Sequence, residues 1–383
     1  MKKFLLATTA LVGFTFSCEA FAAESLLKVT LGGSVEVVGG TYKQKLNDDS
    51  NTDYDFASFY TLDVKAAGKA GGFDCGADFR FSNTASFPKF TPKDSSITLS
   101  HGYIYMSGSF GKIQIGDQRG TTSLAVTTPS VGMGQTEGRI IDFLSSDTFS
   151  KVFVKSVDKK NGTSITYYTP KLGNENHKIQ AGLTYEPKMF SGGADIISKK
   201  NAYKSVIKAA AAYDGSIDFV KLNASAHIVN GGGRAAGYGL KSPVSLHSGF
   251  TAWGLGANAS AYGVKIGINY EDFGKFLAPD IANTKGQYRI GTGIAYEQDC
   301  FGVAFNYITG TAYNFAKLPP VDASTLTRLK GFDSYGIGGV YKWAPGLTSN
   351  ADLVFFQQRF TDDISSSAKG SGYVFLLSQK LAF

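Results

Sequence analysis

The stretch GYVFLLSQKLAF occupies residues 372–383, and its side chains alternate in character from one residue to the next. One face of an extended chain would carry Tyr373, Phe375, Leu377, Gln379, Leu381 and Phe383. The other face would carry Val374, Leu376, Ser378, Lys380 and Ala382. Because the last residues of a soluble domain usually fray, an apolar face that runs up to Phe383 predicts a strand lying against lipid. We interpret this stretch as the closing strand of a transmembrane β-barrel.

The start of the sequence predicts export from the cytoplasm. Lys2 and Lys3 precede a short, mostly apolar run at residues 4–16, and Ala20-Phe21-Ala22 matches the small-x-small pattern of a signal peptidase site. The apolar run is too short for a spanning helix, and residues 15–17 form a poor lipoprotein motif before Cys18. We therefore expect a signal peptide at residues 1–22 and a single barrel domain at residues 23–383.

Period-two alternation continues through the remaining sequence in sixteen segments, with charged residues on one face and apolar residues on the other. The segments are residues 27–37, 60–66, 73–81, 97–105, 113–115, 164–169, 178–186, 205–213, 220–228, 253–259, 264–270, 288–296, 303–307, 335–343, 349–356 and 372–383. Short turns, such as residues 68–72, alternate with longer connections, such as the Asp- and Asn-rich residues 43–55. An even number places both termini on the periplasmic side. Because an open sheet edge is not tolerated in lipid, the first and last strands are expected to pair.

The composition fits this interpretation, with 46 Gly, 20 Tyr and 29 Phe suited to strands, turns and aromatic girdles. A soluble β-sandwich would also show alternation, because one face of each sheet is buried and the other is wet. Two features favour the barrel: the apolar face is rich in aromatic residues in strand after strand, and short and long connections alternate throughout. We predict an all-β fold, a 16-stranded antiparallel transmembrane barrel.

The net charge of +7 falls to +6 when Lys2, Lys3 and Glu19 leave with the signal peptide. No basic run accompanies this mild excess, so nucleic-acid binding is not expected. Cys75 and Cys300 fall on well-separated strands, too far apart for a disulfide. Four aspartates of the first loop, Asp48, Asp49, Asp53 and Asp55, are candidates for Ca²⁺. Their spacing matches no EF-hand, so we expect a solvated loop and no cofactor.

Two motifs carry a family resemblance. Residues 101–116, HGYIYMSGSFGKIQIG, resemble the signature of Gram-negative general porins, in which an aromatic-rich strand meets a Gly-x-Phe-Gly turn and then a strand ending in glycine. Residues 161–170, NGTSITYYTP, are similar to a porin segment that opens with Asn and ends in Tyr-x-Ser-Pro. With the signal peptide and the terminal Phe383, the resemblance extends over the mature chain. It is strongest to the 16-stranded trimeric porins of alphaproteobacteria.

The resemblance implies that the third extracellular loop folds into the lumen and constricts it. The corresponding connection, residues 121–160, is the longest in the sequence and far exceeds an ordinary surface loop. Its Glu137, Arg139 and Asp142 are expected to face basic groups of the wall, for which Arg80, Arg119 and Lys65 are the candidates. Opposed charges across a narrow water-filled gap would orient dipolar solutes. The alternative is a solvated surface loop. Porins often carry Gly-Arg at the end of the fifth strand, whereas this chain has Gly116-Asp117-Gln118-Arg119.

The resemblance also implies partners: two further copies in a homotrimer, the outer-membrane bilayer with its lipopolysaccharide, and the barrel-assembly machinery. That machinery would read the terminal Phe383 together with Tyr373, Phe375, Leu377 and Leu381.

We expect an outer-membrane channel for passive diffusion of small hydrophilic solutes and ions. Selectivity is expected to be weak, because the polar strand faces carry similar numbers of basic and acidic residues. The ten basic residues are Lys28, Lys65, Arg80, Lys178, Lys208, Lys221, Lys265, Arg289, Lys342 and Lys380, and the eight acidic ones are Glu36, Asp63, Asp74, Asp78, Glu186, Glu271, Glu297 and Asp352.

Three other functions remain open on the same fold. A channel specific for a sugar or a phosphate would look the same in sequence, and so would a plugged structural or adhesive barrel. An outer-membrane hydrolase is not expected, because the sequence contains no G-x-S-x-G motif. Its four histidines, His101, His177, His227 and His247, are also scattered without an evident serine partner.

Overall fold

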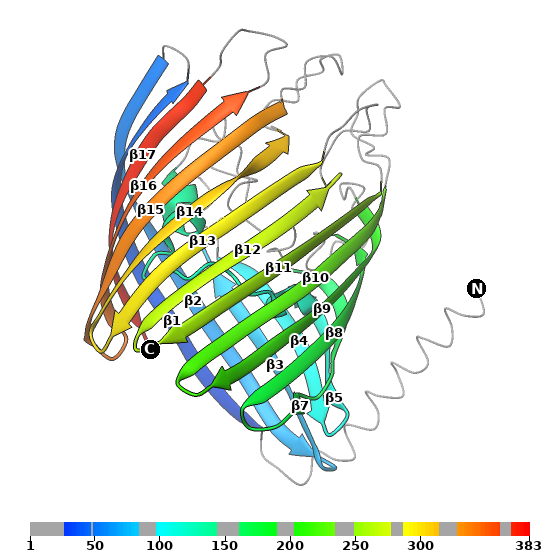
Figure 1. The fold of residues 1–383 in the computed structure, drawn as a ribbon. Helices are drawn as coiled ribbons and strands as arrows, with labels where there is room; N and C mark the ends of the chain where they lie inside the picture. The colour runs from blue at the N-terminus through cyan, green and yellow to red at the C-terminus, as the bar shows by residue number, and fades with distance from the viewer. Residues whose placement is uncertain are drawn as a thin grey trace.

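The computed structural model describes residues 27–46, 49–83, 97–143, 161–189, 203–233, 249–276, 286–313, 328–360 and 369–383. They form one antiparallel sheet that closes on itself as a barrel (Figure 1). Its strands are β1 (Lys28–Leu46), β2 (Asp49–Ala70), β3 (Phe73–Ser82), β4 (Thr98–Gly108), β5 (Gly111–Gln118), β6 (Gly162–Tyr168), β7 (Leu172–Gly173), β8 (His177–Lys188), β9 (Tyr203–Ile217), β10 (Val220–Gly233), β11 (Phe250–Ala261), β12 (Val264–Gly274), β13 (Gln287–Gln298), β14 (Phe301–Tyr313), β15 (Arg328–Ala344), β16 (Leu347–Phe360) and β17 (Lys369–Ala382). Because β7 is a two-residue piece paired with β8, sixteen full strands form the wall, as predicted.

The barrel closes at the seam between β1 and β17, which pair antiparallel from Ser34↔Ala382 to Leu46↔Gly370. Phe383 extends the seam by one residue, since its N–H donates to the Gly33 carbonyl at 3.0 Å and its own carbonyl accepts from the Gly33 N–H at 2.9 Å. Pairing between the first and last strands leaves neither edge of the sheet open. The predicted closure is confirmed.

Tight turns join the strands at one end of the barrel. Glycines with positive φ occupy several of them, among them Gly72 at +83°, Gly263 at +80° and Gly346 at +82°. These values are readily adopted only by glycine, which is why the short connections of the sequence mark hairpins. The predicted hairpin layout therefore follows from turn chemistry as well as from alternation.

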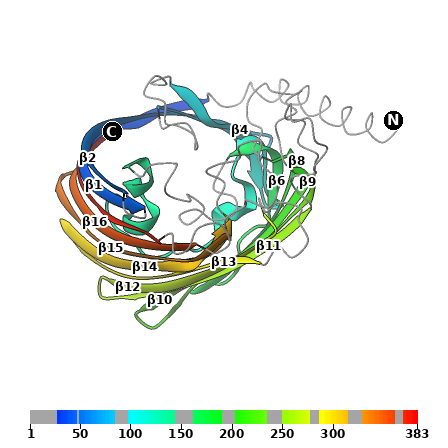
Figure 2. The ribbon, with the colours of Figure 1, turned by 90° about the horizontal axis from the view of Figure 1, so that it is seen from above.

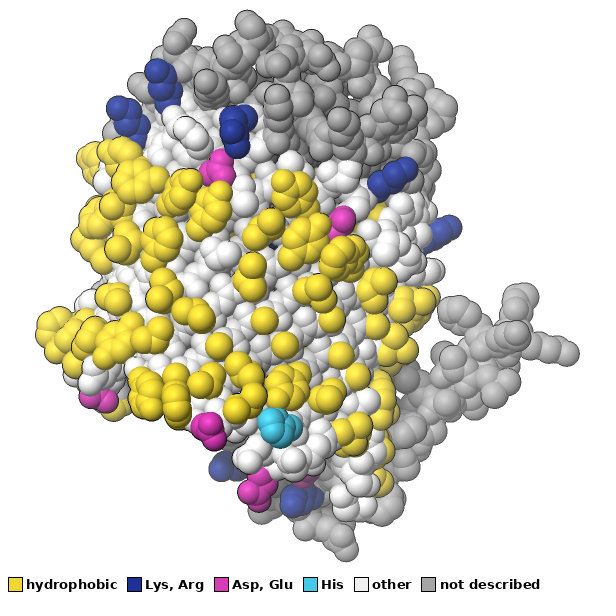
Figure 3. Space-filling model, viewed as in Figure 1, with side chains coloured by type: hydrophobic (Ala, Val, Ile, Leu, Met, Phe, Trp, Pro, Cys, Tyr) yellow, Lys and Arg dark blue, Asp and Glu magenta, His cyan; other side chains and the backbone are white. Residues whose placement is uncertain are grey.

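The outer face of the wall is a band of apolar side chains, with charged residues gathered at its edges (Figure 3). Leu377, Leu381 and Phe383 of the closing strand are 52%, 50% and 71% exposed on this face. The predicted apolar face of residues 372–383 thus points outward. Its one polar member, Gln379, accepts a hydrogen bond from Ser349 at 2.6 Å, and Ser349 accepts one from the Trp343 indole at 2.7 Å. The apolar band is therefore interrupted by a polar row whose members bond one another.

The expected loop at residues 43–55 is wrong. β1 continues to Leu46 and β2 begins at Asp49, and the two pair through this region in the register Lys43↔Thr52. The ladder needs only main-chain groups, so polar side chains are compatible with it where a hairpin stands in water. Asp53 and Asp55 instead accept hydrogen bonds from the N–H groups of the residues that follow them.

Several expectations concern residues outside the described ranges. They include the signal peptide at residues 1–22 and Asp48 of the Ca²⁺ hypothesis. Within the described ranges, no helix is long and apolar enough to cross a membrane, and no three metal-binding side chains come together. Cys75 and Cys300 form no disulfide.

Candidate functional site

The connection after β5 runs inside the barrel. Its described part, residues 119–143, is called the inner loop below, and it contains three short 3-10 helices: η1 (Gly120–Leu124), η2 (Gln135–Glu137) and η3 (Arg139–Phe143). Seen from above, these helices lie within the ring of strands (Figure 2). The inward fold expected from the resemblance is therefore present.

The first part of the inner loop is hydrogen-bonded to successive strands of the wall. The Thr121 N–H donates to Thr184 of β8 at 2.9 Å. The Val126 N–H donates to Ser225 of β10 at 2.7 Å. Further bonds join Thr127 to Asn258 of β11 at 3.2 Å and Thr128 to Asn269 of β12 at 3.0 Å. Inward-facing polar residues of this wall thus hold the loop rather than line the water.

The middle of the inner loop is held by the next strands of the wall, β12 to β16. Asp352 of β16 accepts hydrogen bonds from Gln135, one from the main-chain N–H at 2.9 Å and one from Nε2 at 2.7 Å. Glu137 lies 3.0 Å from the guanidinium of Arg289 on β13, and Glu271 of β12 lies 3.7 Å from the same group. Arg289 is 1% exposed. A buried cation shared by two carboxylates therefore clamps the loop to the wall.

The last described part of the loop is anchored to the seam strands. Arg139 forms an ion pair with Glu36 of β1 at 2.9 Å, and its guanidinium lies 3.6 Å from the centre of the Phe59 ring. Beside it, apolar residues of the loop pack on inward-facing apolar residues of the wall. This cluster comprises Met133, Ile140, Phe143, Val38, Phe59, Ile308, Phe332, Val354, Phe356, Val374 and Leu376. A small hydrophobic core thus sits inside the barrel.

Glycines at inward-facing wall positions let the loop approach the sheet closely. A Cβ placed on Gly291 would lie 2.8 Å from the Thr128 hydroxyl, and one on Gly293 would lie 2.9 Å from the Pro129 carbonyl oxygen. A Cβ on Gly336 would lie 2.9 Å from Gln135 Cβ. Real Cβ contacts are not this short, so larger side chains would push the loop away. Several glycines of the wall therefore serve the fit of the loop.

This close fit predicts that Gly256→Ala shifts the inner loop, because the new methyl group would collide with the Val126 carbonyl oxygen. Overpacking of this kind costs about 1–3 kcal/mol. We expect the purified protein to unfold at a lower temperature and its single-channel currents to be noisier. Gly339→Ala is the matched control, since its nearest neighbour would be a carbonyl oxygen at 3.5 Å. Equal behaviour of the two variants would contradict the fit.

Among the described residues, a cavity lies on the other side of the lumen. It has a volume of about 770 Å³ and lies between strands β2–β5 and the η1 end of the inner loop. Its charged and aromatic lining residues are Asp78, Arg80, His101, Tyr103, Lys112, Arg119 and Tyr168. Hydroxyl and amide side chains line most of the rest, namely Thr61, Ser82, Ser100, Gln114, Gln118, Ser123, Asn161 and Gln180, and Gly120 and Leu124 of η1 complete it. The passage is therefore polar and asymmetric.

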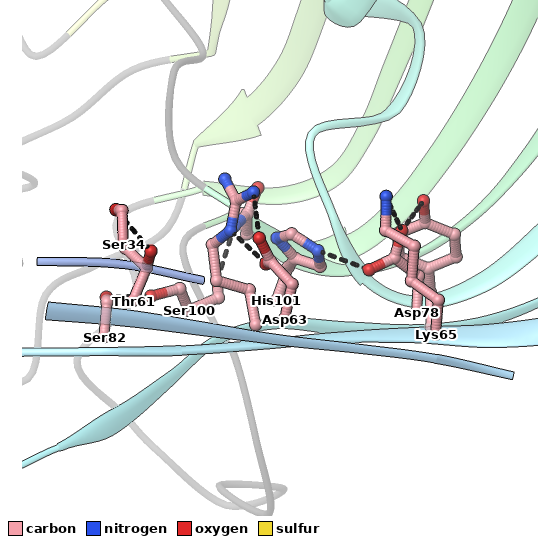
Figure 4. Close-up of polar contacts among 11 residues, drawn as sticks. Ser34, Thr61, Asp63, Lys65, Asp78, Ser82, Ser100 and His101 are labelled. Atoms are coloured by element: carbon pink, nitrogen blue, oxygen red, sulfur yellow. Dashed lines mark hydrogen bonds and ion pairs between the residues drawn. The ribbon is translucent and has the colours of Figure 1, made fainter. Parts of the chain in front are cut away.

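Ion pairs cross the open wall from strand to strand (Figure 4). Asp63 accepts from Arg80 twice, at 2.6 and 2.9 Å. Asp78 lies 3.7 Å from the Lys65 ammonium and 3.1 Å from His101 Nε2. Asp63↔Arg80 and Lys65↔Asp78 are register partners of β2 and β3, so the sheet itself places these charges side by side.

The structure thus separates the predicted constriction residues into two groups. Arg80 and Arg119 line the cavity, and Lys65 lies beside it. Glu137 and Arg139 instead turn toward the wall, so the expected opposition of Glu137 to Arg80, Arg119 and Lys65 is wrong, because Arg289 occupies that role. Asp142 falls in η3, and its side chain lies outside the described part of the chain.

Sequence reasoning missed the anchoring function of the wall. Arg289, Glu271, Glu36 and Asp352 were recognised as inward-facing but were expected to face water. Lys112 and Tyr168 were not singled out at all. One usable signal existed: apolar Val374 and Leu376 interrupt the polar face of the last strand, which indicates contact with something inside.

Comparison with known proteins bears on this arrangement. The solved anion-selective porin of Comamonas acidovorans superimposes with a TM-score of 0.61 at 15% identity, covering 94% of this chain and all of that one. OmpF of Salmonella typhi, in complex with daunomycin, superimposes with a TM-score of 0.58 at 11% sequence identity, covering 93% of this chain and 98% of that one. In-vitro folded OmpT of Vibrio cholerae, in a trimer form, superimposes with a TM-score of 0.55 at 11% sequence identity, covering 94% of this chain and 100% of that one.

These likenesses establish the fold. No curated protein sequence matches the chain. The profile of a sequence family described as Gram-negative porin matches residues 7–361, a span that reaches from the N-terminal region to just past the end of β16. The chain belongs to the Gram-negative porin family, and it forms a channel of the outer membrane.

Proposed function

We propose that small hydrophilic solutes and ions cross the outer membrane by passive diffusion through the cavity between β2–β5 and the inner loop. The observation that carries this proposal is the path of the loop. Its described part, residues 119–143, is held to the inner face of the wall from β8 to β16 by hydrogen bonds and buried ion pairs, and a polar cavity lies beside it against β2–β5. Arg80 and Lys65 form the wall side of the constriction, and Arg119 with η1 forms its other side.

The same geometry supports a mild preference for anions. Of the ten basic residues expected to face inward, Lys208 and Arg289 are buried, which leaves eight. Of the eight acidic residues, Glu36, Glu186, Glu271 and Asp352 are buried, which leaves four. Lys112 and Arg119 add two more cations at the cavity. Charges that face the water set ion selectivity. The excess of cations among them therefore gives the passage a modest preference for anions.

A charge reversal at the constriction tests this function. Arg80→Glu places a second carboxylate beside Asp63, so the zero-current potential in a salt gradient across a planar bilayer should move toward the cation value. Lys178→Glu makes the same change of charge on β8, outside the cavity lining. We expect a clear shift for Arg80→Glu and little for Lys178→Glu. Equal shifts would mean that the ions pass elsewhere.

The proposal extends to assembly. We infer a homotrimer embedded in a bilayer with lipopolysaccharide, supported by the trimer form of one structural neighbour. The outward-facing Tyr373, Phe375, Leu377, Leu381 and Phe383 remain our candidates for the signal read by the barrel-assembly machinery.

A further inference from the structure

Asp78 occupies the centre of a cluster of donors at the cavity. Lys65 approaches one of its oxygens at 3.7 Å, and the Tyr103 hydroxyl donates to the same oxygen at 3.4 Å. His101 Nε2 lies 3.1 Å from the other oxygen. The carboxylate is itself 16% exposed and lines the cavity. The donors of the wall therefore form a binding site for a carboxylate group, and the carboxylate of Asp78 occupies this site (Figure 4).

Two further cations of the cavity lack a carboxylate partner. Within the described part of the chain, neither Lys112 nor Arg119 forms an ion pair. The Lys112 ammonium instead lies 4.6 Å from the centre of the Tyr105 ring, and Arg119 is exposed. Both line the same cavity as the amides of Gln114, Gln118 and Gln180. Unpaired cations beside amide and hydroxyl groups suit a solute with an anionic group and several hydroxyls.

We propose that this cavity is a transit site for small hydroxylated anions, those with a carboxylate or a phosphate beside hydroxyl groups, and that Asp78 keeps their binding weak. This inference rests on the proposed function, because it assigns a solute class to the same passage. The fixed carboxylate of Asp78 competes with the solute for Lys65 and His101 and repels it from Lys112 and Arg119. A channel conducts only when its site attracts a solute and also releases it, and Asp78 supplies the release.

The test is solute block of single-channel current through the purified full-length mature protein in a planar bilayer. Gluconate, glucose 6-phosphate and glucose are added in turn at equal osmolarity, so that carboxylate, phosphate and neutral forms are compared. We expect the two anions to reduce the current at lower concentration than glucose. Asp78→Asn should lower the half-blocking concentration of the anions about tenfold, since it removes one negative charge within a few ångströms of the bound group.

Asp74→Asn is the matched control. Asp74 lies on the same strand, faces the same side and is exposed, yet it is not part of the cavity lining. It should leave the block by all three solutes unchanged. A second variant, Arg119→Gln, removes a cation that has no ion pair to lose, so it should raise the half-blocking concentration several-fold without disturbing the wall.

The outcomes separate the two levels of the proposal. Channels that open normally but show equal block by gluconate and glucose would overturn the transit site alone. So would an Asp78→Asn variant that behaves like Asp74→Asn while still showing conductance steps. Block by glucose 6-phosphate but not by gluconate would restrict the solute class to phosphates and refute the carboxylate form. An unaltered protein without conductance steps would contradict the proposed function itself.

Discussion

Arg289→Met is expected to release the inner loop from the wall and to destabilise the barrel more than any other single substitution considered. The guanidinium is 1% exposed and lies between Glu137 at 3.0 Å and Glu271 at 3.7 Å. Removing it leaves two carboxylates in a dry site with no cation between them. Breaking a buried ion pair in this way costs about 3–5 kcal/mol. The freed loop should then enter the passage, lowering the mean conductance and producing long-lived closures.

The measurement pairs single-channel recording with the thermal transition of the protein in detergent. Lys342→Met is the matched control, because Lys342 also pairs a cation of the wall with a carboxylate, Glu297 at 3.3 Å, but both side chains are about half exposed. Exposed pairs contribute only about 0–1 kcal/mol, so this variant should behave almost as the unaltered protein.

A double substitution gives a further check on the clamp. Adding Glu137→Gln to Arg289→Met removes one of the two orphaned charges, so the pair of changes should cost less than the sum of its parts. The clamp does not hold the loop if the Arg289→Met channel shows steady, full-sized currents and its thermal transition lies at the same temperature as that of the Lys342→Met variant.

The wall of this barrel could be predicted because its physics is local. In a strand that faces lipid on one side and water on the other, successive residues must alternate. The sequence around Phe73, Cys75 and Phe79 shows that alternation without reference to any other part of the chain. The same reasoning failed at residues 43–55, because nearly every side chain there is polar and polarity no longer distinguishes a strand from a loop.

The site could be predicted only in part, because its contacts join distant residues. Glu137 of the loop pairs with Arg289 of the wall, and Arg139 of the loop pairs with Glu36. These partners are far apart in the sequence, and no pattern within either segment specifies its partner. A charged residue on an inward face is equally consistent with a wet wall and with a buried anchor. Arg80 lines the cavity and Lys65 pairs with Asp78 beside it; their partners lie on the adjacent strand, where register decides proximity.

Apolar residues on the inner face carry the information that was overlooked. Val374 and Leu376 are 0% and 1% exposed, although they lie on the side of β17 that faces the lumen. An aliphatic side chain has no reason to face a water-filled pore, so its presence there indicates that protein covers it. Together with inward glycines such as Gly291 and Gly293, these positions trace the path of the loop over the wall.

Deletion of Phe383 is expected to reduce the amount of assembled barrel sharply while leaving the conductance of the remaining channels unchanged. The residue closes the seam, because its main chain both donates to and accepts from Gly33. Its ring lies over Gly33, where a Cβ would come within 3.0 Å of the ring edge. Losing these contacts frays the one junction on which closure depends, and an open edge is very costly in lipid.

Conductance should survive the deletion because Phe383 is 71% exposed on the outer face, away from the cavity. We expect outer-membrane levels to fall by about tenfold, since unpaired main-chain groups at the seam meet hydrocarbon. Phe383→Tyr is the matched control. It keeps the main-chain hydrogen bonds and the aromatic ring, so its outer-membrane level should equal that of the unaltered protein. Normal levels of the deletion variant would show that the pairing from Ser34↔Ala382 to Leu46↔Gly370 closes the seam without the last residue.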